Sequence, residues 1–140
     1  MCLTGGFALA MMVDDVVQAP VLSQPSLPFA VTAAQKRDVG VDDATLERVR
    51  ERAAKGACLM GLRFTGDLMV PPQRFQRLRE VLGEQFIAIE IDSSPGNTFG
   101  ISRTAHSVLA HDYVDEVGHP TRAAFDSVVA FFHDRLSGDV

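Results

Sequence analysis

One stretch of the chain decides the fold: residues 57–91, which read ACLMGLRFTGDLMVPPQRFQRLREVLGEQFIAIEI. The apolar runs at 58–64 and 86–91 each predict a buried strand, the second being apolar except for Glu90. Between them, Pro71 and Pro72 open a predicted helix. Its inner face carries Phe75, Leu78 and Leu82. Strand, helix and strand in this order indicate a parallel βαβ unit, so the fold class is α/β.

The flanking segments extend the same pattern on both sides. Residues 16–22 are apolar and β-branched and predict a third strand that runs into a turn-rich loop, and residues 7–13 predict a short buried helix. Asp42 and Asp43 are natural caps for a helix from about residue 44 to residue 54. Its predicted inner residues are Leu46, Val49 and Ala53. Pro120 starts a final helix, whose core side is predicted to hold Phe125, Val128, Val129, Phe132 and Leu136.

Length and composition predict one globular domain. The 140 residues are 46% hydrophobic and 22% charged, and the mean hydropathy is +0.10. A net charge of −5 argues against nucleic acid as a partner. The apolar opening, residues 1–13, is shorter than a membrane-spanning helix, and no basic residue precedes it as in a signal peptide. Two cysteines, neither in a zinc-binding pattern, fit a cytoplasmic protein without a structural metal.

In a parallel sheet, reactive groups gather in the loops at the carboxyl ends of the strands, so the candidate catalytic residues are sought in these loops. Cys2 stands before Thr-Gly-Gly and an apolar helix, where backbone N–H groups lower a thiol pKa and hold an oxyanion. Asp67 comes three positions after the 58–64 strand, and His106 lies in the loop before the last helix. The order of nucleophile, acid and histidine is that of the α/β-hydrolase architecture.

Other reactive side chains have simpler interpretations. Cys58 lies inside a predicted strand, where a buried cysteine is usually inert. Asp92 follows the 86–91 strand and is interpreted as a turn residue. Three further histidines are interpreted as structural or solvated: His111, His119 and His133.

Three segments also carry a family resemblance: CLTGG from Cys2, FTGDLMVP around Asp67 and AHSVL around His106. They resemble the nucleophile, acid and histidine segments of the dienelactone hydrolase family. The resemblance implies an α/β-hydrolase fold, a Cys-Asp-His triad, no metal or organic cofactor, and hydrolysis of lactones or other esters of small carboxylic acids. It covers the second half of such a domain, so we expect residues 1–140 to be a partial domain whose first strands, with a second oxyanion donor, would precede Met1.

The implied reaction is covalent acyl transfer. His106 takes the proton of Cys2, the thiolate attacks the ester carbonyl, the N–H of Leu3 donates to the oxyanion, and Asp67 orients the imidazole. Two other classes of protein remain open. A flavodoxin-like binding module would need a phosphate loop, and neither GxxxxGK[ST] nor GxGxxG occurs. An inactive hydrolase remnant would bind a partner or form homodimers through an exposed sheet edge at residues 16–22.

Overall fold

The computed structural model describes residues 1–137. Its elements, in chain order, are the 3-10 turn η1 (Cys2–Thr4), α1 (Phe7–Met11), β1 (Val21–Ser23), α2 (Ala33–Arg37), α3 (Asp43–Ala54), β2 (Leu59–Phe64), α4 (Pro72–Leu82), the 3-10 turn η2 (Gly83–Gln85), β3 (Phe86–Ile91) and α5 (Pro120–Leu136). Within this part of the chain, no helix has both the length and the apolar character that crossing a membrane requires.

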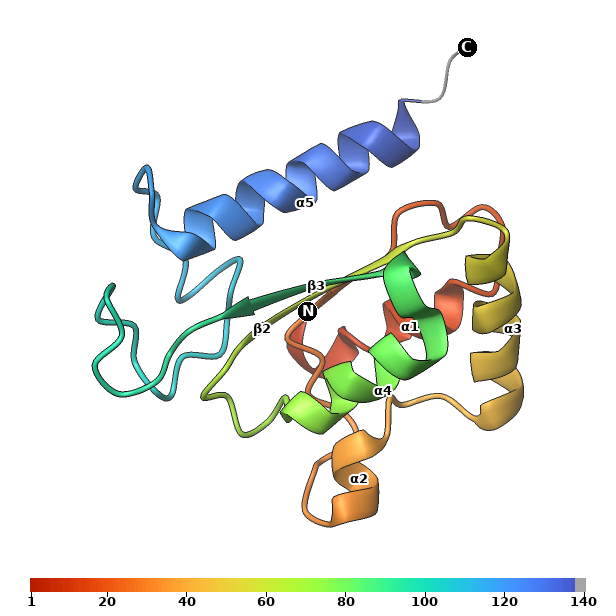
Figure 1. Ribbon diagram of the computed structural model, residues 1–140, viewed down its shortest axis with the longest axis horizontal. Coiled ribbons are helices and arrows are strands. Elements are labelled where there is room, and N and C mark those ends of the chain that lie inside the picture. The colour runs from red at the N-terminus through yellow and green to blue at the C-terminus, as the bar shows by residue number, and fades with distance from the viewer. Residues whose placement is uncertain (138–140) are drawn as a thin grey trace.

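The three strands form one parallel sheet in the order β1-β2-β3. Helices α1, α3 and α4 cover one face of the sheet, and α5 lies alone across the other (Figure 1). The α/β class is therefore confirmed. Because all three strands run the same way, their carboxyl ends lie at one edge of the sheet, and the loops that follow them meet there.

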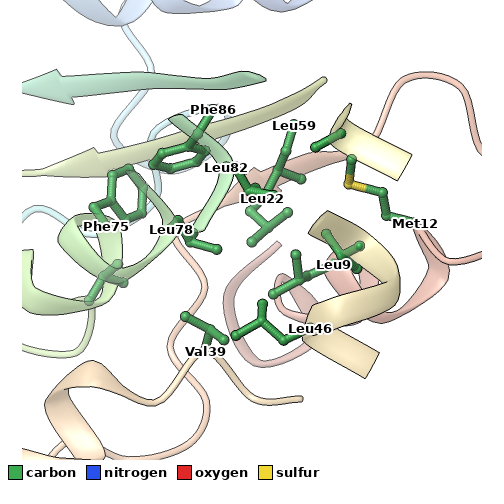
Figure 2. Packing of buried hydrophobic residues seen from close by; sticks show 13 residues of the cluster. Leu9, Met12, Leu22, Val39, Leu46, Leu59, Phe75, Leu78, Leu82 and Phe86 are labelled. Atoms are coloured by element: carbon green, nitrogen blue, oxygen red, sulfur yellow. The ribbon is translucent and has the colours of Figure 1, made fainter. Parts of the chain in front are cut away.

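The core under the three helices matches the sequence pattern closely. Leu59 and Phe86 point from the sheet toward α3 and α4, and the rings of Phe75 and Phe86 pack edge to face with centroids 5.3 Å apart (Figure 2). The predicted inner residues of α3 and α4 are all buried. Asp42 caps α3, accepting a hydrogen bond from Thr45 N at 2.7 Å. These two helices and strands β2 and β3 therefore form where local signals place them.

Helix α5 corrects one prediction. Its bounds agree with the start predicted at Pro120, but its buried residues are Thr121, Ala124, Val128 and Phe131. Four of the five residues expected in the core are exposed: Phe125 at 42%, Val129 at 49%, Phe132 at 38% and Leu136 at 62%. The reason is that both sets recur at helical spacing, so the periodicity defines two neighbouring apolar stripes and does not choose between them.

The N-terminal segments correct two further predictions. Strand β1 covers only Val21–Ser23, and Val16 is 77% exposed, so the edge expected at residues 16–22 is much shorter than predicted. Residues 14–17 form a turn instead, in which Val17 N donates to Asp14 O at 3.2 Å. Helix α1 buries Leu9 but exposes Phe7 at 61%, so it is only partly the buried helix expected.

Candidate active site

Cys2 lies on a sharp turn at the N-terminal side of α1. Its φ of 54° is in the left-handed region, which a non-glycine residue adopts only where the surroundings hold it. The surroundings here are close. A Cβ on Gly5 would lie 3.0 Å from both Ser23 O and Pro25 Cα, so only glycine lets the turn press against the end of β1. The thiol is therefore presented at the carboxyl edge of the sheet.

Asp67 lies in the short loop between β2 and α4. It is 6% exposed, and its Oδ1 accepts a hydrogen bond from Met69 N at 2.9 Å. Its other oxygen, Oδ2, lies 2.6 Å from His106 Nδ1. One oxygen thus fixes the carboxylate to its own loop, which leaves the other to orient the imidazole.

His106 joins the two other candidate residues. It lies in the long loop between β3 and α5, close to Ala105 and Val108, which are buried against the α5 core. Its Nε2 is 3.0 Å from Cys2 Sγ, while its Nδ1 faces Asp67. The three residues singled out from the sequence are therefore brought into one chain of contacts, although 104 positions separate Cys2 from His106.

Two further residues support this chain of contacts and are not singled out by the sequence pattern. The Ser26 hydroxyl lies 3.5 Å from Cys2 Sγ. Asp112 Oδ2 accepts the backbone N–H groups of both His106, at 3.0 Å, and Ser107, at 2.8 Å. Ser26 follows the carboxyl end of β1 as Asp67 follows that of β2, and this position in the sequence is the signal that could have identified Ser26 as a site residue. No local pattern indicates the role of Asp112.

The hydrogen bonds at the site shift the pKa values of Cys2 and His106 toward each other. Hydrogen bonds from Ser26 and His106 lower the pKa of Cys2, and the backbone N–H of Leu3 contributes in the same direction. Burial would lower the pKa of His106, but its hydrogen bonds to Cys2 and Asp67 outweigh that effect and raise it. With the thiol pKa lowered and the imidazole pKa raised, both shifts favour proton transfer from Cys2 to His106.

The residues set aside from the sequence lie elsewhere. Cys58 is buried next to the amino end of β2, the opposite end from Asp67, and its Sγ contacts Arg135 Nη2 at 2.7 Å. Asp92 Oδ1 accepts Ser94 N at 2.8 Å, the turn contact predicted for it. His119 caps α5 with its Nδ1 directed at Thr121. Among residues 1–137, no three histidine, cysteine, aspartate or glutamate side chains gather as a metal site would require.

No protein-family model, curated protein or solved structure matches the chain. The case for a function therefore rests on the residues and their geometry.

Proposed function

We propose that this protein is a hydrolase of carboxylic esters or lactones, similar to the dienelactone hydrolase family, with Cys2 as nucleophile. The observation that carries the proposal is the continuous contact from Asp67 through His106 to Cys2, with distances of 2.6 and 3.0 Å. Nucleophile, base and orienting acid within hydrogen-bond reach are what covalent acyl transfer requires. A thiolate nucleophile persists in a reducing compartment, and we place the protein in the cytoplasm.

The reaction proceeds in two halves. The Cys2 thiolate attacks the carbonyl carbon, and the N–H of Leu3 stabilises the oxyanion. The His106 imidazolium then gives its proton to the departing alcohol, which leaves a thioester on Cys2. In the second half His106 takes a proton from water, the hydroxide attacks the thioester, and the carboxylic acid leaves as the thiolate re-forms. Asp67 keeps the imidazole in the required tautomer throughout.

The test uses the full chain and an activated ester such as p-nitrophenyl acetate. Cys2→Ala should abolish turnover, and intact-mass measurement should find an acetyl adduct on the wild type but not on this variant. Cys58→Ala is the matched control and should leave turnover nearly unchanged. Equal loss from both changes overturns the assignment of Cys2. Rapid alkylation of Cys2 without any turnover would mean a reactive thiol in a protein that is not a hydrolase.

A further inference from the structure

Ser26 lies against the sulfur of Cys2 and is completely buried, with an exposed fraction of 0%. Within residues 1–137, Cys2 Sγ is the only hydrogen-bond partner of its hydroxyl, at 3.5 Å. A buried hydroxyl without a partner is costly, so this contact is what satisfies it. We infer that Ser26 is a further catalytic group, which donates a hydrogen bond to Cys2 Sγ and stabilises the thiolate. This inference rests on the proposed function.

The direction of the hydrogen bond follows from the chemistry of the sulfur. A thiolate has no proton, so it can only accept, and both Ser26 Oγ and His106 Nε2 must then donate to it. A neutral thiol is a weak acceptor, so its bond from the hydroxyl would be weak. The Ser26 hydrogen bond therefore strengthens when Cys2 ionises, because bonds to charged groups are the strong ones. Its effect is to favour the reactive form of the nucleophile.

The backbone fixes Ser26 at this position. Ser26 N donates to Cys2 O at 3.3 Å, so the two residues are joined through main chain as well as side chain. On the other side, the buried guanidinium of Arg74 on α4 donates to Pro25 O and Pro28 O, each at 2.6 Å. The segment that carries Ser26 is thereby held from both sides, so the hydroxyl is in position before any substrate arrives.

The electrostatics of the site agree with this geometry. The Ser26 hydrogen bond is the largest of the effects that lower the pKa of Cys2, ahead of that from His106. His106 is the titratable group that faces Sγ, and Asp67 lies behind it. When the sulfur attacks a carbonyl carbon, its electron pair forms the new S–C bond, the C=O π bond breaks, and the negative charge moves from the sulfur to the carbonyl oxygen. It returns when the thioester is hydrolysed, so Ser26 is neither consumed nor changed.

The test measures how fast iodoacetamide alkylates Cys2 as a function of pH. Trypsin separates the two cysteines, because Lys36 and Lys55 lie between them, so mass spectrometry can follow the Cys2 peptide alone. Ser26→Ala should move the midpoint of the profile to higher pH and slow alkylation at pH 7 roughly three- to tenfold. Ser26→Gly removes the same hydroxyl and serves if the alanine variant does not fold. Ser127→Ala, at an exposed serine of α5, is the matched control.

The outcomes separate this inference from the proposed function. An unchanged midpoint in a folded Ser26 variant overturns the role of Ser26, even if the wild type hydrolyses esters. A shifted midpoint together with ester turnover by the wild type supports that role. A shifted midpoint without turnover shows the hydrogen bond to the thiolate but overturns the catalytic role along with the proposed function. If the Ser127 variant shifts as far as the Ser26 variant, the shift is not specific to the hydroxyl at Cys2, and the inference fails.

Discussion

The acid segment, residues 65–71, carries Asp67, and the histidine segment, residues 92–119, carries His106, and these two side chains meet. The two segments are held in place differently. The acid segment is a short connection from β2 to α4, whereas the histidine segment takes a long irregular path from β3 to α5. They touch at Gly66, where a Cβ would lie 2.8 Å from Arg103 O, so only glycine allows this approach. The triad geometry therefore depends on two supports of different kinds.

The acid segment is held by the sheet. Arg63, on β2 and 1% exposed, donates through Nε to Val70 O at 2.8 Å and through Nη2 to Thr65 O at 3.1 Å. Its charge is balanced by Glu90 on β3. Burial would raise the pKa of Glu90, but hydrogen bonds from Arg79 and Arg63 outweigh this and lower it, so the carboxylate stays charged. The buried guanidinium of Arg63, paired with Glu90 on the neighbouring strand, thus fixes both ends of the loop that carries Asp67.

The histidine segment is held by side chains of its own. Asn97 closes one part of it, accepting from Ile101 N at 2.9 Å, and Asp112 closes the part around His106. Gln24, directly after β1, donates from Nε2 to Ser107 Oγ at 3.3 Å, and Ser93 Oγ accepts from Gly66 N of the acid segment at 2.9 Å. We therefore expect a substitution that removes contacts holding the acid segment to lower the free energy of unfolding of the whole protein. A substitution that removes contacts holding the histidine segment should instead reduce order only around the site.

The largest effect is expected from the histidine itself. His106→Ala should lower ester turnover by about 10³-fold or more, since it removes the base and leaves Asp67 with nothing to orient. It also removes one cause of the lowered pKa of Cys2, so the alkylation midpoint should move to higher pH. Alkylation of the wild type should rise as pH increases through that lowered pKa, because the thiolate is the reactive form.

The control for this variant is His111→Ala, an exposed histidine of the same segment. It should leave both turnover and the alkylation profile unchanged. Asp67→Asn should also be damaging, and the double variant with His106→Ala should be little worse than His106→Ala alone, since the triad acts as a unit. Strictly additive losses would mean that the two segments do not cooperate.

The second-largest effect is expected from Arg63, which holds the acid segment to the sheet. Arg63→Met removes a buried guanidinium and orphans the two carbonyls to which it donates, so the free energy of unfolding should fall by about 3 kcal/mol, measured by urea titration. Arg79→Met is the matched control, because Arg79 binds the same Glu90 from the surface with its side chain 46% exposed. It should cost less than about 1 kcal/mol. Equal costs would show that the sheet does not hold the acid segment through Arg63.

The same contrast explains how much of the molecule could be predicted from sequence. Helices α3 and α4 and strands β2 and β3 have strong local signals, so their positions could be predicted closely. The limits of β1 could not, because the strand forms only where β2 offers partners, such as Met60 for Val21. The three candidate site residues follow from chain order and the carboxyl-end rule, and their catalytic roles stay predictions.

Contacts between residues far apart in the chain could not be predicted from the sequence, because no local pattern links the two partners. Ser26 meets Cys2 across 24 positions, and Gln24 meets Ser107 across 83. The buried stripe of α5 could not be predicted for the same reason, because the sheet against which the helix packs determines which of the two apolar stripes is buried. Side-chain support of irregular segments is therefore where structure adds most to the sequence pattern.

The smallest effect is expected from the support of the histidine segment. Asp112→Ala removes the acceptor for the N–H groups of His106 and Ser107, which should cost about 1–2 kcal/mol of local order and reduce Cys2 alkylation at pH 7 by a few fold. The unfolding midpoint should move little, because a loop can open without the sheet. Asp112→Asn keeps an acceptor oxygen at the same place and should restore the alkylation rate. Asp115→Ala, at an exposed carboxylate that pairs with Arg122, should change neither measurement. If Asp112→Ala lowered global stability as much as Arg63→Met, the histidine segment would be part of the same cooperative unit as the acid segment, and the distinction between the two supports would fall.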